Sequence, residues 1–138
     1  MRVTEWRSIG VLAVVVFVAA ACARSDPDSR TAPPASSVEG DSATVARLEA
    51  EARAMARADG CSSAGQCLTA PVGERACGGP REYLVYCART TDTAALHRKL
   101  AELRQAEMAL NQKTGAVSTC EFREPPATQL VAGACRAR

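Results

Sequence analysis

The chain has 138 residues, seven cysteines, one histidine and a formal net charge of +2, which is enough sequence for one domain. Its 17 basic residues are spread along the chain, which argues against a dedicated nucleic-acid-binding face. Only 4% of the residues are aromatic, so a core must rely on aliphatic packing and covalent cross-links.

The first 21 residues predict a secretory signal peptide. Arg2 and Arg7 form a basic head, and an apolar stretch from Ile9 to Ala21 follows them. This stretch is shorter than the roughly 20 apolar residues that a membrane-spanning helix needs. It also lacks the polar face of an amphipathic helix, so export is the better interpretation.

The apolar stretch ends in Ala19-Ala20-Ala21-Cys22, which resembles the lipobox of bacterial lipoproteins. The resemblance implies cleavage before Cys22 and acylation of this cysteine, and two or three acyl chains hold a protein firmly on a membrane. Ala23 replaces the aspartate that marks retention at the inner membrane, which implies an outer-membrane anchor facing the periplasm. The alternative is ordinary signal-peptidase cleavage at an Ala-x-Ala site, which leaves Cys22 without a role.

Residues 22–40 predict a disordered tether. Beyond the cysteine this stretch is rich in proline, serine, aspartate and alanine, and it offers almost no side chain that a core could bury. Such a sequence forms a flexible, solvated linker. We therefore expect residues 41–138 to form one folded domain that stands off the membrane surface.

Six cysteines remain in the predicted domain, and an even number in an exported chain of this size predicts a disulfide framework. Fifteen pairings are possible. Zinc is the alternative, but the cysteine spacings are wide and His97 is the only histidine, so we expect no metal and no cofactor. The low entropic cost of closing short loops favours Cys61–Cys67, Cys77–Cys87 and Cys120–Cys135.

The first half of the domain predicts one helix and two strands. The helix runs from about Ser42 to Ala58, with apolar residues at steps of three and four on one face. Cys67 to Val72 predicts a short strand, and Pro71 favours an edge position for it. Glu82 to Ala88 is the most strand-like segment, and its alternation places the side chains of Leu84 and Tyr86 opposite those of Tyr83, Val85 and Cys87.

The second half predicts a long helix and two further strands. Thr91 or Asp92 caps a helix that runs to about Lys113, and Gly115 ends it. One stripe of this helix carries four leucines together with Glu107. The tail predicts two strands, Ala116–Phe122 and Thr128–Ala134, that pair in antiparallel fashion.

These elements predict a small disulfide-stapled α+β domain. One long helix packs on a three- or four-stranded, mostly antiparallel sheet, and an N-terminal helix precedes it. Residues Cys61 to Cys135, and above all Cys77-Gly78-Gly79-Pro80 followed by Tyr83, resemble a family of small bacterial secreted proteins and lipoproteins with a Cys-Gly-Gly-Pro-x-x-Tyr core. The resemblance implies a fold and an exported location, and it implies no activity.

The sequence contains no motif that ties His97 to a serine or a free thiol, so we expect a solvated surface histidine and no catalytic residue. Ser62, Ser63 and Ser118 lie beside cysteines, which favours structural roles. Gly78-Gly79 predicts a tight turn with positive φ in preference to an anion-binding nest. The alternation of Glu74, Arg75, Arg81, Glu82 and Arg89 predicts a mixed, solvated surface.

Three functions compete. The favoured one is a non-enzymatic structural or binding module, anchored to the membrane through Cys22 and open to an envelope protein partner. The second is an inhibitor of a protease or another hydrolase, because a disulfide scaffold can hold a loop such as Ala70–Pro80 rigid. The third is a thiol oxidoreductase, which only the cysteine count suggests, since Cys77 and Cys87 lack the C-x-x-C form.

Overall fold

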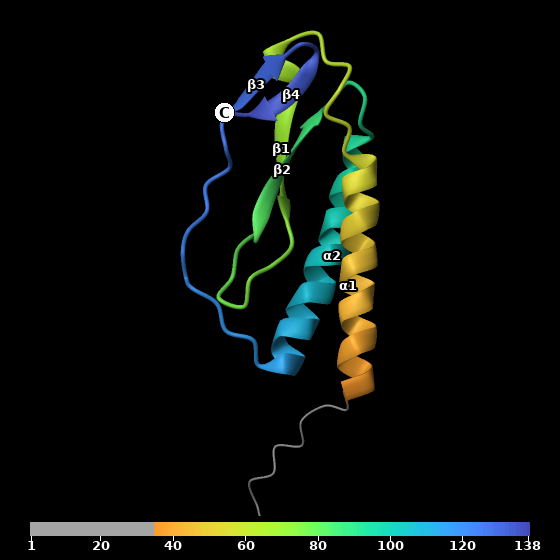
Figure 1. The fold of residues 1–138 in the computed structure, drawn as a ribbon, viewed down its shortest axis with the longest axis vertical. Helices are drawn as coiled ribbons and strands as arrows, with labels where there is room; N and C mark the ends of the chain where they lie inside the picture. Colours follow the sequence, from red (N-terminus) through yellow and green to blue (C-terminus); the bar gives the residue numbers. More distant parts are fainter. Residues whose placement is uncertain (1–34) are drawn as a thin grey trace, which may run out of the picture. The chain divides into compact units, whose positions relative to one another are not determined.

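The computed structural model describes residues 35–138 (Figure 1). The predicted signal peptide, Cys22 and the first part of the predicted tether lie outside the described residues. The described part is an α+β fold with two helices, two small antiparallel sheets and three disulfides. The elements in chain order are α1 (Ala35–Met55), a short 3-10 turn (Ala64–Gln66), β1 (Cys67–Val72), β2 (Glu82–Cys87), α2 (Thr93–Thr114), β3 (Thr128–Val131) and β4 (Ala134–Ala137).

Helices α1 and α2 lie side by side and form one wall of the domain (Figure 1). Helix α1 begins at Ala35, before the predicted start at Ser42 and inside the stretch predicted as a tether. Lys113 near the end of α2 forms an ion pair with Asp41 in α1. The partner helix therefore supports these early turns, and composition alone could not indicate that support.

The ends of α2 agree with their predicted capping signals. The Asp92 carboxylate accepts a hydrogen bond from the Ala95 N–H at 2.9 Å. Gly115 adopts a left-handed conformation with φ of 61°, and its N–H donates to the Asn111 carbonyl. Both ends satisfy backbone groups that a helix leaves unpaired, so local sequence is enough to define this helix.

Replacing Asp92 by alanine should lower the free energy of unfolding by about 1 kcal/mol, since the N-terminal turn of α2 loses its cap. Urea denaturation with the disulfides intact measures this change. Asp92→Asn is the matched control and should retain most of the stability, because asparagine caps equally well. Equal stability of the alanine and asparagine variants would contradict the capping role.

Strands β1 and β2 form an antiparallel hairpin in which Cys67 lies opposite Cys87 and Val72 lies opposite Glu82. The predicted alternation is confirmed, because Leu84 and Tyr86 pack into the core against the two helices. Tyr86 is 1% exposed and is among the largest fully buried side chains of this core. The core under β1 and β2 also contains Leu48, Ala52, Ala70, Val72, Leu96, Leu100 and Leu103.

The strands form two separate two-stranded sheets, where the prediction had one sheet of three or four strands. Strand β3 pairs with β4 through a tight turn at Ala132 and Gly133, both of which have positive φ. The predicted strand Ala116–Phe122 is wrong, because these residues form neither helix nor strand. The adjacent β4 closes a hairpin with β3 at low entropic cost, which leaves this stretch without a partner strand.

The three disulfides are Cys61–Cys87, Cys67–Cys135 and Cys77–Cys120, and all three differ from the predicted short-loop pairs. The register of β1 and β2 places Cys67 and Cys87 side by side on the face opposite the helices. Cys87 bonds to Cys61, in the stretch between α1 and the 3-10 turn, and Cys67 bonds to Cys135 in β4. Strand pairing therefore decides the connectivity, and loop length does not.

Candidate binding surface

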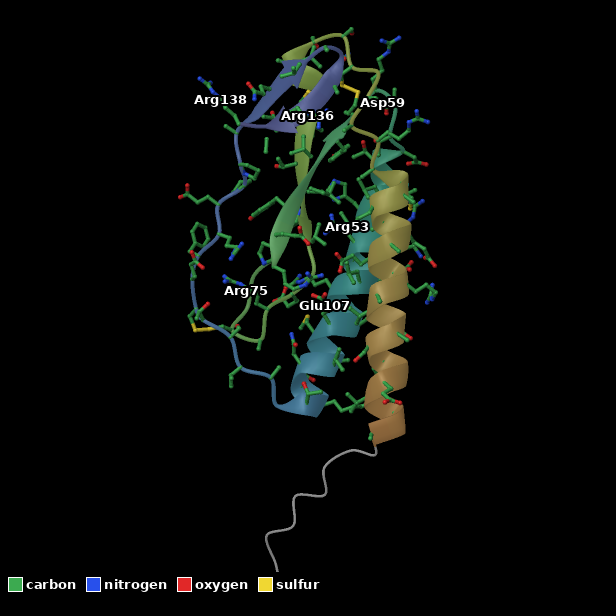
Figure 2. The ribbon with its side chains drawn as sticks, in the orientation of Figure 1. Arg53, Asp59, Arg75, Glu107, Arg136 and Arg138 are labelled. Carbon is green, nitrogen blue, oxygen red and sulfur yellow. A yellow bond between two sulfur atoms is a disulfide. The ribbon has the colours of Figure 1, made fainter. Side chains whose placement is uncertain are left out.

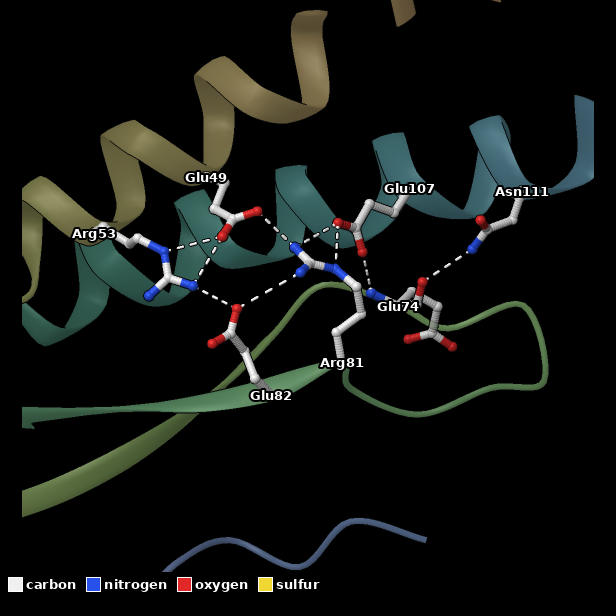
Figure 3. A network of polar contacts seen from close by, with 7 residues as sticks. All are labelled: Glu49, Arg53, Glu74, Arg81, Glu82, Glu107 and Asn111. Carbon is white, nitrogen blue, oxygen red and sulfur yellow. Dashed lines mark hydrogen bonds and ion pairs between the residues drawn. The ribbon is translucent and has the colours of Figure 1, made fainter. Parts of the chain in front are cut away.

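The loop Gly73–Arg81 joins β1 to β2 and is fixed to both helices by a network of charged side chains (Figure 3). Glu107 of α2 is only 5% exposed, and it accepts hydrogen bonds from the Glu74 N–H and, at 2.8 Å, from Arg81 Nε. Arg81 also contacts Glu49 of α1 at 2.6 Å. The predicted mix of opposite charges is present, and Arg81, which is partly exposed, links both helices to the sheet.

The carboxylate of Glu49 lies between two guanidinium groups, those of Arg53 and Arg81. Burial acts to raise the pKa of Glu49, but the hydrogen bonds and the positive charges of Arg53 and Arg81 together lower it by more, so its pKa lies below the ordinary value. Arg53 also contacts Glu82 at the start of β2. These ion pairs keep the Glu49 carboxylate charged at neutral pH and link α1 to Arg81 and to β2.

Gly73 starts this loop in a conformation that suits glycine, with φ of 71°. A Cβ atom at this position would overlap the carboxylate of Glu107 and lie 2.8 Å from Arg81 Nε. These two groups are engaged with each other and cannot move aside freely. Glycine is therefore required here for close approach of the backbone to α2 as well as for its φ angle.

Glu74 shapes the rest of the loop. Its carboxylate accepts from the Gly79 N–H at 3.2 Å and from Arg104 Nε at 2.7 Å, and its carbonyl accepts from Asn111 Nδ2 at 2.9 Å. Gly78 and Gly79 both have positive φ, which confirms the predicted tight turn. Because the Gly79 N–H is used inside the loop, the turn serves the fold and does not form an anion nest.

Residues 116–127 connect α2 to β3, and we call them the exposed segment. Every residue from 116 to 125 is exposed to solvent. The Cys77–Cys120 disulfide ties the segment to the loop Gly73–Arg81, and the Cys77 N–H donates to Ser118 Oγ at 3.1 Å. The structural role predicted for Ser118 is therefore confirmed, and the loop that α2 holds in turn holds the segment.

Side chains of the loop and of β2 bind the backbone of the exposed segment, and Figure 2 labels Arg75 of the loop. The Arg75 guanidinium donates to the carbonyls of Thr119, at 3.4 Å, and of Glu121. The Tyr83 hydroxyl donates to the carbonyl of Arg123 at 3.2 Å. The bound carbonyls belong to every second residue, which is the periodicity of an extended chain with one edge against the domain.

Two large apolar side chains of the exposed segment project into solvent. Val117 is 94% exposed and Phe122 is 83% exposed. A hollow of about 300 Å³ lies on one side of Phe122, against Cys77–Pro80, and another of about 450 Å³ lies against Tyr83 and Pro126. An aromatic ring this exposed on a fixed backbone is a candidate contact for a partner protein.

The structure changes the location of the predicted inhibitor loop. Ala70 and Val72 of the predicted loop Ala70–Pro80 are buried in β1, and Glu74 is bonded to α2 through its N–H and its carbonyl. The exposed segment takes its place as the rigid, solvent-facing loop. Its sequence signal is the run Cys-Glu-Phe-Arg-Glu-Pro-Pro, in which a cysteine and two prolines bracket an exposed aromatic residue.

The predicted surface histidine is confirmed, because His97 is exposed on α2 and its ring stands edge-on to Tyr86 with 6.4 Å between centroids. Ser62 donates from its backbone N–H and hydroxyl to Gln66, and Ser63 caps the 3-10 turn. These serines therefore hold a turn together, as the sequence predicts.

The sulfur atoms of Cys61, Cys67 and Cys135 lie within 4.8 Å of one another. All three are buried and belong to disulfides, so they offer no thiolate to a metal ion. Cys77 and Cys87, which were predicted to bond to each other, bond to different partners. The buried disulfides Cys61–Cys87 and Cys67–Cys135 join β1, β2 and β4 and form a second small core.

Comparison with known proteins finds no match for this chain among family models, curated proteins or solved structures. Among residues 35–138, no helix combines the length and the apolar content needed to cross a membrane.

Proposed function

We propose that this chain is a lipid-anchored binding module of the bacterial outer membrane that faces the periplasm and acts without catalysis. The lipobox-like sequence before Cys22 supports the anchor. The stretch that follows it supports a flexible linker between the anchor and the domain. The resemblance to small secreted proteins and lipoproteins agrees with this location.

The single observation that carries the proposal is the exposed segment, which is fixed and solvent-facing at once. A disulfide holds Cys120, and side chains from the domain hold the carbonyls on either side of it. Binding normally costs the entropy of ordering a loop, and a loop that is already ordered avoids most of this cost. The domain therefore serves as a scaffold that presents this segment to a protein partner in the envelope.

Site-specific photo-crosslinking in cells tests the binding surface. A photoreactive residue at Val117 should give a discrete crosslinked product with an envelope protein, because this side chain is exposed on the segment. The same residue at Gln105, which is exposed on α2, is the matched control and should give none. Equal labelling from both positions, or no product from Val117, would contradict the proposal.

The anchor has its own test. The intact mass of the protein from envelope membranes should correspond to a chain that starts at Cys22 and carries acyl groups. Cys22→Ala should move the protein out of the membrane fraction, and Cys120→Ala, which removes a cysteine of the domain, should leave it there. An unacylated product from the unaltered chain would contradict the anchor and leave the binding surface to be judged by crosslinking.

A further inference from the structure

We infer that the exposed segment is an inhibitory loop for an endopeptidase and that Phe122 fills the apolar primary pocket of that protease. This inference rests on the proposed function, because it names the class of partner that the exposed segment binds. Three features of the segment support it: one backbone edge is free, an exposed aromatic side chain lies on that edge, and both halves of the segment are held by the domain.

The backbone of the segment has one bound edge and one free edge. In an extended chain, backbone groups of residues i and i+2 point to the same edge. The carbonyls of Glu121 and Arg123 are bound to the domain, so the backbone groups of Phe122 point to the opposite edge. Among residues 35–138, no hydrogen bond is made to the N–H or the carbonyl of Phe122.

A free extended edge is the form in which a peptide adds to a strand of its partner, with alternate side chains entering pockets. Phe122 is the large apolar side chain at the centre of this edge, and it is 83% exposed. A protease with a chymotrypsin-type hydrophobic slot takes such a side chain in its primary pocket. The hollows on either side of the segment leave room for the walls of a cleft around it.

The way in which the segment is held favours inhibition over digestion. Nucleophilic attack on the Phe122 carbonyl carbon forms an ester with the protease serine and breaks the Phe122–Arg123 amide bond, whose nitrogen takes the serine proton. Both new ends stay attached, because the Cys77–Cys120 disulfide holds one side and Tyr83 holds the Arg123 carbonyl on the other. The retained amine can attack the ester, which re-forms the peptide bond and returns the proton to the serine.

The test uses the mature chain with its disulfides intact, purified chymotrypsin and trypsin, and chromogenic peptide substrates. The unaltered chain should inhibit chymotrypsin at near-stoichiometric concentration. Phe122→Ala should raise the inhibition constant at least about 30-fold, which is the loss expected for a central aromatic anchor. Val131→Ala is the matched control, because it removes an exposed apolar side chain on β3, outside the exposed segment, and it should leave the inhibition constant unchanged.

A change of specificity provides a second test that loss of folding cannot imitate. Phe122→Lys should weaken inhibition of chymotrypsin and create inhibition of trypsin, whose primary pocket binds a basic side chain. Inhibition of trypsin alone by the unaltered chain would overturn the inference and assign the pocket contact to Arg123. Steady hydrolysis at Phe122 without lasting inhibition would also overturn it.

The outcomes separate this inference from the proposal on which it rests. If neither chymotrypsin nor trypsin is inhibited while crosslinking from Val117 still gives a discrete product, the inhibitory role fails and the binding surface stands. If both experiments are negative, the two fail together.

Discussion

Replacing Cys67 and Cys135 together by alanine should lower the free energy of unfolding by about 4 kcal/mol, which is the chain-entropy contribution of a disulfide that closes a loop of this size. The two residues are 68 positions apart in the chain. Their bond connects β1 to β4, and both cysteines are buried in the second core. The midpoint of urea denaturation, compared under non-reducing conditions, measures the effect.

The matched control for this prediction is the double variant Cys77→Ala with Cys120→Ala. That bond joins residues 43 positions apart, so its loop-entropy contribution is similar, but it lies on the surface and anchors the exposed segment. We expect the control variant to lose a similar free energy of unfolding through loop entropy. It should keep both packed cores and lose the fixed geometry of the exposed segment. A loss below about 1 kcal/mol for the Cys67 and Cys135 variant would contradict the stabilising role argued from loop entropy.

Glu107→Ala should lower the free energy of unfolding by about 2 to 3 kcal/mol. The substitution leaves the Glu74 N–H without its acceptor and removes one of the carboxylates around Arg81, and an unsatisfied buried donor alone costs about 1 to 3 kcal/mol. Arg81 is partly exposed and keeps its contact with Glu49, so the loss should stay below the full cost of an unpaired buried charge. Denaturation by urea and hydrogen exchange at the Glu74 amide measure the two effects.

Glu102→Ala is the matched control for Glu107→Ala. Glu102 lies on the same helix and contacts Lys99, but its side chain is 55% exposed, so its removal should change stability by less than about 0.5 kcal/mol. Faster exchange at the Glu74 amide is expected for the Glu107 variant alone. Equal losses for the two variants would show that the buried network does not hold the loop Gly73–Arg81.

The elements with local signals could be predicted from the sequence. Strand β1 has the predicted bounds Cys67 and Val72, and α2 ends at Thr114 because the predicted stop residue Gly115 adopts the left-handed conformation that ends a helix. The alternation in β2 correctly placed Tyr83 and Tyr86 on opposite faces, because successive side chains of a strand point to opposite sides, and the structure shows that Tyr86 is the buried one. Each of these features depends on residues within a few positions of one another.

The contacts of Glu107 could not be predicted from local sequence. Its position in the leucine stripe of α2 was visible in the sequence, but its partners lie 26 and 33 residues away, at Arg81 and at the Glu74 backbone. The start of α1 at Ala35 also depends on a contact that is distant in the sequence, because Lys113 in α2 pairs with Asp41 in α1. Sequence patterns of helical or strand period carry no information about such partners.

The sequence by itself determined the class of the folded part, which is a small α+β domain with an even set of cysteines, and the export signal before it stays a prediction. Only the tertiary structure decided which cysteines pair and which loop faces solvent. The pairing follows from the register of β1 with β2, which brings Cys67 and Cys87 together under the β3–β4 hairpin. Once that hairpin closes on itself, residues 116–127 have no strand to join, and side chains from the loop and from β2 hold them at the surface instead.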